Sequence, residues 1–149
     1  MRRRNGFTMI EMLMVIVVVS LVALVTLPKF QDAMGQNTLH GTRSRVMSRF
    51  AAARAAAVTS GRVAYLHVHG NQLYVTAKPR RATAGTGTQD TITPVENLYT
   101  IYGVSMTPVG ADSVRIDPNG VGGTAATVLL SKGSRVDTVH ISKYGRVMK

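Results

Sequence analysis

The sequence predicts an α+β protein in which a long N-terminal transmembrane helix continues into a segment that packs on a small antiparallel β-sheet domain. Residues 7–28 are almost wholly apolar. As a helix this run reaches about 33 Å, roughly the thickness of a bilayer core. From residue 63 onward apolar and polar residues alternate between frequent turn residues. Such alternation indicates antiparallel strands with one buried face.

Composition limits the chain to one modest soluble core beside the apolar segment. The 149 residues include 18 Lys and Arg, 7 Asp and Glu and no Cys, and the net charge is +11. Without Cys there is no disulfide framework, thiolate nucleophile or Cys-ligated metal. A positive field of this size attracts nucleic acid, anionic lipid or acidic polymers. A solvated basic surface explains the same charge equally well.

The N-terminal segment allows three interpretations. A secretory signal peptide needs a small-x-small cleavage site after its apolar run, and residues 25–30 offer none. A plain single-pass anchor fits the length but gives no reason for Glu11, because a carboxylate inside a bilayer costs a few kcal/mol. Cleavage between Gly6 and Phe7 would create a new amine and place Glu11 fifth in the mature chain. The third interpretation therefore explains Glu11.

This arrangement resembles the class III signal of type IV pilins and pseudopilins. The matching residues are Arg2, Arg3, Arg4, Gly6, Phe7, Thr8, Glu11, the apolar helix that follows and Pro28. The resemblance implies a leader at 1–6, cleavage after Gly6 by a prepilin peptidase and N-methylation of Phe7. It also implies that Glu11 pairs with the Phe7 amine of a neighbouring subunit, and that Pro28 kinks the helix.

The arginines of the leader also set an orientation. Basic residues that flank a membrane span stay cytoplasmic. The segment 7–28 is therefore expected to cross a membrane once, with the C-terminal part outside the cytoplasm. The resemblance implies that this membrane is the inner membrane and that the C-terminal domain lies in the periplasm.

The helix is expected to continue as an amphipathic segment over residues 29–60. Apolar residues recur at helical spacing and form one stripe: Leu39, Val46, Phe50, Ala53 and Ala57. Gly35 and Gly41 weaken the helix by about 1 kcal/mol each. Gly61 is positioned to cap its C-terminus.

Residues 61–149 are expected to form the β-rich domain. The predicted strands are 63–69, 72–77, 98–104, 113–117, 125–131, 136–142 and 146–148. Turns are predicted at Gly70-Asn71 and over residues 117–120. Residues 78–97, rich in Thr, Gly and Pro, predict a long loop.

The downstream sequence resembles the GspH/FimT type of pseudopilin and minor pilin. The residues that carry this resemblance are 51–58, 115–120, 128–131, 139–142 and 145–147. With the N-terminal signal, the resemblance covers nearly the whole chain outside the loop.

Motifs for chemistry are scarce. His67 and His69 share one face of a predicted strand, but no third ligand is evident nearby, and a surface or sheet-packing pair explains them better than a metal site. Residues 117–120 lack the carboxylate spacing of a calcium loop. Four tyrosines are expected in strands: Tyr65, Tyr74, Tyr99 and Tyr102. The sequence therefore predicts no catalytic residue, cofactor or metal, and a membrane-tethered enzyme lacks a visible polar pocket.

Several basic residues are candidate DNA contacts: Arg80, Arg81, Lys143, Arg146 and Lys149. FimT-type minor pilins that bind DNA carry a Gly-Arg-x-Arg motif near the C-terminus. Here Gly145 and Arg146 match, and Met148 stands in place of the second Arg. A solvated basic tail is the alternative.

The predicted function is that of a minor pseudopilin, a structural subunit of a type II secretion pseudopilus. The alternative is a minor type IV pilin of FimT type, acting in pilus biogenesis or DNA uptake. The expected partners are other pilin or pseudopilin subunits, the prepilin peptidase, the inner membrane and, in the alternative, DNA. A DNA-binding module that merely uses a pilin anchor is a rival of another class.

Overall fold

The computed structural model describes residues 7–78, 89–144, 147 and 148. The chain divides into two compact units, residues 1–35 and residues 36–149, and each is considered by itself. Helix α1 (Met9–Ser60) supplies residues to both units and is continuous through Pro28, Gly35 and Gly41. The predicted helix, 7 to about 60, is therefore confirmed within two residues at its start.

The C-terminal half of α1 buries one stripe of side chains. Its buried residues are Leu39, Thr42, Val46, Phe50, Ala53 and Ala57. All five predicted apolar positions are among them, and Thr42 is satisfied by donating its hydroxyl to the carbonyl of Thr38 at 2.9 Å. The helix ends as predicted at Gly61, whose φ of 63° is left-handed. The amide of Arg62 reaches the carbonyl of Ala57 at 3.2 Å, the bond that closes a Schellman motif.

A five-stranded antiparallel sheet follows the helix. Its main path runs β3 (Asp90–Thr91), β2 (Gln72–Ala77), β1 (Ala64–His69) and β6 (Ser113–Ile116), and β4 (Glu96–Asn97) also pairs with β2. The β1–β2 hairpin turns at Gly70-Asn71, both with positive φ, as the sequence predicts. Because the register pairs Ala64 with both Ala77 and Ile116, the start of β1 lies beside the ends of β2 and β6.

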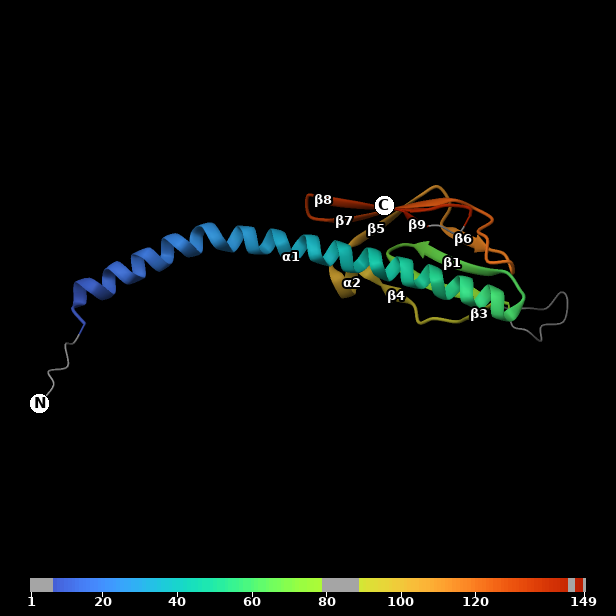
Figure 1. Cartoon of the computed structure of the whole chain (residues 1–149), viewed down its shortest axis with the longest axis horizontal. Coiled ribbons are helices and arrows are strands. Elements are labelled where there is room, and N and C mark those ends of the chain that lie inside the picture. The colour runs from blue at the N-terminus through green and yellow to red at the C-terminus, as the bar shows by residue number, and fades with distance from the viewer. Residues whose placement is uncertain (1–6, 79–88, 145–146, 149) are drawn as a thin grey trace, which may run out of the picture. The chain divides into compact units, whose positions relative to one another are not determined.

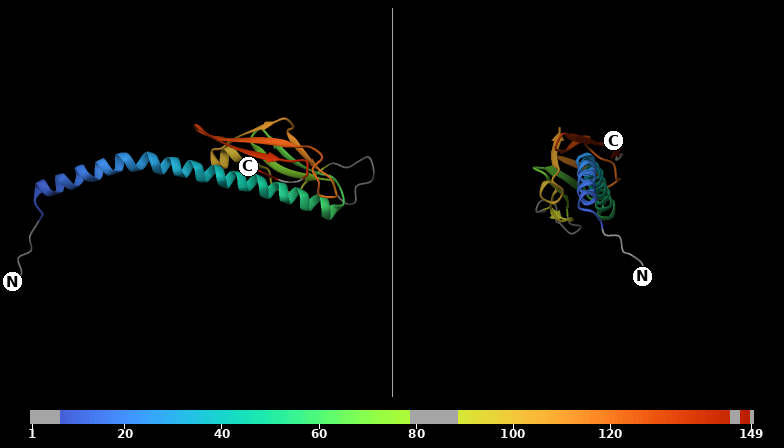
Figure 2. Two further views of the ribbon diagram at one scale, coloured as in Figure 1. Left: turned by 45° about the horizontal axis from the view of Figure 1, so that its top comes forward. Right: turned by 90° about the vertical axis from the view of Figure 1, so that its left-hand side faces the viewer.

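A second, four-stranded antiparallel sheet completes the domain. Its order is β5 (Ser105–Val109), β7 (Ala126–Lys132), β8 (Arg135–Ile141) and β9 (Val147–Met148). Figures 1 and 2 show residues 36–60 of α1 lying alongside the two sheets. One hydrophobic cluster joins the α1 stripe to side chains from both sheets, such as Leu66 and Leu130, both fully buried. The expected α+β class is confirmed, with two sheets where one was expected.

The predicted strand over residues 98–104 is wrong. Residues Leu98–Tyr102 form a short helix, α2, because both of its ends are capped. The side chain of Asn97 accepts hydrogen bonds from the amides of Tyr99 and Thr100 at 3.0 and 3.1 Å. Gly103, with φ of 64°, closes the other end. Local capping chemistry outweighs the β propensity of the aromatic and β-branched residues here.

The predicted loop over residues 78–97 also needs correction. Its end contains β3 and β4, which hydrogen-bond to β2. The interior of the loop, residues 79–88, lies outside the described residues. Thr93, between the two short strands, is buried and accepts a hydrogen bond from the amide of Val75 at 3.0 Å. The segment is thus attached to the edge of β2 rather than free of it.

Candidate functional site

The start of α1 forms a capping box around Glu11. The amide of Glu11 donates to the hydroxyl of Thr8 at 3.3 Å, and the amide of Thr8 donates to the Glu11 carboxylate at 3.5 Å. This reciprocal arrangement satisfies amides that the first helical turn leaves without partners. Thr-x-x-Glu is a sequence signature of a capping box, so this second role of Glu11 was readable from the sequence but not predicted.

The apolar part of α1 is suited to an apolar solvent. Its most apolar window has a mean hydropathy of 2.8 and no buried residue, so by length and composition the helix can cross a membrane. Its two hydroxyls are satisfied within the helix, since Ser20 and Thr26 donate to the carbonyls four residues earlier at 2.7 Å. Pro28 lies inside α1, and its predicted kink stays a prediction. Phe7 is 75% exposed, and Gly6 lies outside the described residues.

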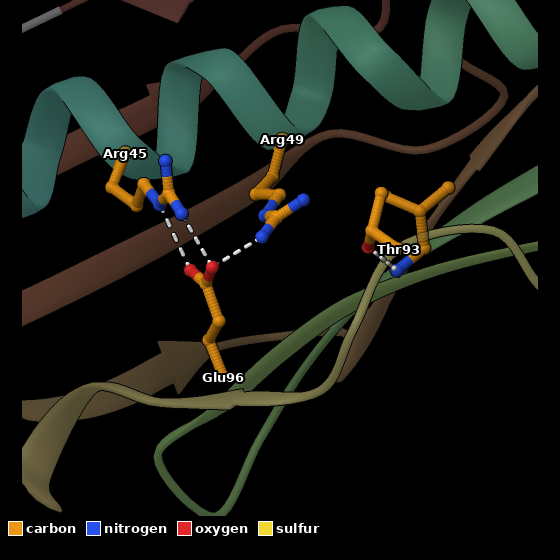
Figure 3. Close-up of polar contacts among 5 residues, drawn as sticks. Arg45, Arg49, Thr93 and Glu96 are labelled. Carbon is orange, nitrogen blue, oxygen red and sulfur yellow. Dashed lines mark hydrogen bonds and ion pairs between the residues drawn. The ribbon is translucent and has the colours of Figure 1, made fainter. Parts of the chain in front are cut away.

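In the β domain, two arginines of α1 converge on one carboxylate of β4. Arg45 donates to both Glu96 oxygens, at 2.9 Å from Nε and 2.5 Å from Nη2, and Arg49 donates to Oε1 (Figure 3). The hydrogen bond from Arg45, together with that from Arg49, lowers the pKa of Glu96. Arg49 and Glu96 are largely buried, each with 12% of the side chain exposed. The sequence did not predict this contact, because helix and strand meet only in the tertiary structure.

The histidines of β1 have separate partners. His67 stacks on Tyr74 with ring centroids 4.6 Å apart, and its Nε2 lies 2.9 Å from the Thr76 hydroxyl. Because that hydroxyl donates its proton to Gln89, His67 is the donor to it. Burial lowers the pKa of His67, which favours its neutral form. His69 instead lies 3.0 Å from Asp112. Among the described residues, no group of three or more His, Asp or Glu side chains is placed to hold a metal ion.

The predicted DNA contacts are only partly placed. Lys143 is exposed, and its ammonium lies 5.2 Å from the ring centroid of Tyr144. The remaining four lie outside the described residues: Arg80, Arg81, Arg146 and Lys149. Because only one of the five lies in the described part of the chain, their joint role in DNA binding stays a prediction.

Three other cations do meet, at the end of the five-stranded sheet. A hollow of about 410 Å³ is lined by Gly61, Arg62, Val63, Tyr65, Lys78, Arg115 and Pro118. Sequence reasoning missed this cluster because its cations are 16 and 37 positions apart along the chain. The available signal was the predicted β1–β2 hairpin, which places residues before β1 next to residues after β2.

The long helix, its exposed apolar half and the N-terminal motif together define the class of protein to which this chain belongs. Residues 1–27 match the prokaryotic N-terminal methylation motif. With an apolar helix that by length and composition can cross a membrane and that continues into an antiparallel β domain, the chain is a pilin-like protein. Residues 42–145 match the family described as type II transport protein GspH, and the chain belongs to that family.

Solved structures share the fold. The type IV minor pilin FimU of Pseudomonas aeruginosa, in its P21 crystal form, superposes with a TM-score of 0.57 at 14% identity, over 76% of this chain and 88% of FimU. The P65 crystal form of FimU gives a TM-score of 0.51 at 14% identity, over 73% and 90% of the two chains. Comparison with curated protein sequences gives no significant match.

Proposed function

We propose that this protein is a minor pseudopilin, a structural subunit of a type II secretion pseudopilus in the inner membrane, with residues 36–149 in the periplasm. The observation that carries the proposal is the match of residues 42–145 to the GspH family, joined to the N-terminal methylation motif. The subunit acts by packing and not by catalysis. Its apolar helix enters the filament core, and its β domain lies on the outside.

Processing prepares the helix for assembly. In this proposal the prepilin peptidase cleaves after Gly6 and methylates Phe7. The Glu11 carboxylate then pairs with the Phe7 amine of a neighbouring subunit. Two opposite charges that would each be costly in an apolar core offset part of that cost when paired. Such pairing is compatible with the capping contact, because a carboxylate accepts several hydrogen bonds.

A second candidate function is that of a FimT-type minor pilin in pilus biogenesis or DNA uptake. The specific observation in its favour is charge. The chain carries a net +11, and the hollow at the end of the five-stranded sheet is lined by three cations. In this candidate Lys143 and the four basic residues outside the described part contribute further phosphate contacts.

Deletion of the gene in its host separates the two candidates. Loss of exoprotein secretion with normal surface pili supports the pseudopilin. Loss of pili or of DNA uptake with normal secretion supports the minor pilin. If secretion, piliation and DNA uptake all stay normal, both candidates are wrong.

Incorporation is tested separately by cross-linking. The natural chain contains no cysteine, so a single Val25→Cys change introduces the only thiol. When a pilin-like partner carries a cysteine in its own apolar helix, oxidation should yield a dimer in assembling cells. A matched variant, Val95→Cys, places the thiol on an exposed residue of the β domain and should not cross-link to that partner.

A further inference from the structure

A hollow of about 260 Å³ lies between α1 and the first residues of β8, within the unit of residues 36–149. We call it the β8 pocket. Its lining residues are Gln36, Leu39, His40, Arg135, Val136 and Asp137. Helix and strand also contact each other here, because Arg135 Nη1 donates a hydrogen bond to Gln36 Oε1 at 3.4 Å.

Asp137 occupies a position of β8 that faces the core. Every second residue from Asp137 onward is turned inward, and the next two in this series, Val139 and Ile141, are buried. Across the sheet Asp137 pairs with Leu130, which is fully buried. A carboxylate at such a position is costly unless its oxygens find hydrogen-bond donors.

Only one of the two carboxylate oxygens of Asp137 has a hydrogen-bond partner. Oδ1 accepts from the amide of Thr138 at 2.9 Å, whereas Oδ2 is buried and no donor reaches it. By contrast, the carboxylates of Glu96 and Asp117 each accept hydrogen bonds from an arginine. Buried polar atoms in folded proteins are almost always paired, so the free oxygen of Asp137 indicates a contact that the isolated chain does not make.

The outer edge of β8 is open beside the same residue. The amide of Thr138 bonds to a side chain of its own strand and not to β7. Because alternate residues of an antiparallel strand face the same neighbour, Val136 also directs its amide and carbonyl away from β7. Among the described residues, the strand on that side, β9, pairs only with His140 and Ile141. Val136 is exposed, so a further chain can reach this edge.

The free oxygen favours a positively charged donor. Hydrogen bonds between a cation and a carboxylate are roughly twice as strong as neutral ones. Arg135 carries a like charge, but residues two apart on a strand are separated by about 7 Å. By Coulomb's law, a cation at about 3 Å from Oδ2 is attracted roughly twice as strongly as Arg135 repels it. The pocket of about 260 Å³ has room for the end of a long side chain.

We propose that the β8 pocket receives a lysine or arginine side chain from an extended segment of a neighbouring pilin-like subunit, and that the backbone of this segment pairs with Val136 at the open edge. Addition of a strand to an open edge supplies backbone hydrogen bonds. A side chain opposite Asp137 faces the same side of the sheet and supplies the donor for Oδ2. The inference rests on the proposed function for the presence of neighbouring subunits. It gives the β domain a contact that is separate from packing of the apolar helix.

Binding is measured with the full chain in uncharged detergent micelles, labelled with a fluorophore on the single thiol of Val95→Cys. The probes are the other pilin-like subunits of the host, each purified separately, and thermophoresis gives each Kd. One subunit should bind, and Asp137→Asn should weaken its binding about tenfold or more, because a charged hydrogen bond is lost. The control Asp112→Asn removes the same charge from an exposed carboxylate and should change the Kd by less than about twofold.

Cross-linking and a charge exchange locate the partner's residue. The natural chain has no cysteine, so Val136→Cys carries a photoactivatable cross-linker at one defined place. Mass spectrometry should find it joined to one segment of the bound subunit that contains a lysine or arginine. Asp137→Lys should abolish binding, and a change of the partner's basic residue to Glu should restore it. If no such change restores binding, the proposed ion pair is wrong.

Urea unfolding of the unbound chain checks that Asp137→Asn acts on binding. The urea midpoint should not fall, because Oδ2 has no partner to lose in the unbound chain. A lower midpoint would make Asp137 a structural residue and overturn the proposal. Self-association of Asp137→Asn with an unchanged Kd would also overturn it, since Asp137 would then be a charge that protects an exposed edge from aggregation.

Cross-linking through Val25→Cys separates this proposal from the proposed function. If that cross-link forms in cells while no purified subunit binds through β8, only the β8 contact is wrong. If it does not form, the chain is not a filament subunit and both proposals are wrong.

Discussion

The carboxylate of Glu96 lies against the guanidinium of Arg49, although the two residues are 47 positions apart. Glu96 belongs to the two-residue strand β4, and Arg49 belongs to helix α1. Each side chain is 12% exposed, so the pair is mostly shielded from water. The contact therefore ties the edge of the five-stranded sheet to the helix. It gives a short edge strand a fixed position that two residues of backbone pairing alone would not provide.

We predict that Glu96→Gln lowers the free energy of unfolding by about 2 kcal/mol, because a largely buried guanidinium loses a charged acceptor. Urea titration of the full chain in detergent, followed by circular dichroism, measures the change. Arg49→Gln should lower the free energy of unfolding more than Arg45→Gln does. The Arg45 side chain is 44% exposed, so water partly replaces its interaction with Glu96 already in the wild type. Equal losses of unfolding free energy in the two arginine variants would contradict the conclusion that Arg49 and Glu96 are shielded from water.

The same carboxylate predicts a pH dependence. The hydrogen bonds from Arg45 and Arg49 lower the pKa of Glu96 in the folded state. The unfolded chain therefore binds the proton more readily, and the stabilisation is full above the ordinary carboxyl pKa of about 4.3. It is lost as the pH falls below that value and through the folded pKa.

The measurement is the urea midpoint of the wild type minus that of Glu96→Gln, taken from pH 7 down to pH 3 (chosen to bracket about 4.3, the ordinary pKa). This difference should shrink on the acid side. Taking the difference removes the contribution of His67, whose pKa is also lowered in the folded state and which acts in the same direction at higher pH. A difference that stays constant over the whole range would count against the assigned role of Glu96.

Phe50 anchors the helix stripe in the core and is 3% exposed. Phe50→Ala should lower the free energy of unfolding by about 3–5 kcal/mol, because it removes buried apolar area and leaves a cavity. The control is Val95→Ala, at a residue that is 53% exposed, and its cost should stay within about 0.5 kcal/mol. Similar costs for both variants would show that the stripe does not face the core.

Processing predicts a defined mature N-terminus. Mass spectrometry of protein from cells that contain a prepilin peptidase should find N-methylated Phe7 as the first residue. The formal net charge of the mature chain, which lacks Arg2, Arg3 and Arg4, should then be +8. Recovery of chains that still begin at Met1 in such cells would refute cleavage after Gly6.

Two substitutions separate the capping role of Glu11 from its proposed role in assembly. Glu11→Gln keeps a side chain that works in a capping box but removes the negative charge. Glu11→Ala removes both. If the Phe7 amine pairs with this carboxylate, both variants insert into the membrane and both lose filament incorporation, measured by cross-linking through Val25→Cys. Normal incorporation of Glu11→Gln would leave capping as the only role of Glu11.

Much of the fold follows from local patterns. The helix expected over the apolar run, the helical stripe that includes Val46 and the Gly61 cap each depend on residues close together along the chain, and these predictions are confirmed. That residues 7–28 cross a membrane stays a prediction. The hairpin at Gly70-Asn71 was predictable for the same reason, since few residue types adopt positive φ. The strand predicted at 98–104 was wrong because the capping signals at Asn97 and Gly103 were overlooked, although both were present in the sequence.

The sequence by itself determined that this protein has an anchor helix with a pilin-like start and a β-rich domain, because those features depend on hydrophobic periodicity and short motifs. Only the tertiary structure decided that there are two sheets, that Arg45 and Arg49 share Glu96, and that Arg62, Lys78 and Arg115 surround one hollow. Those contacts join residues far apart in the chain. Their partners are chosen by strand register and by packing of the helix on the sheets. Of these contacts, local patterns indicate only that Arg62 lies near Lys78, through the predicted β1–β2 hairpin.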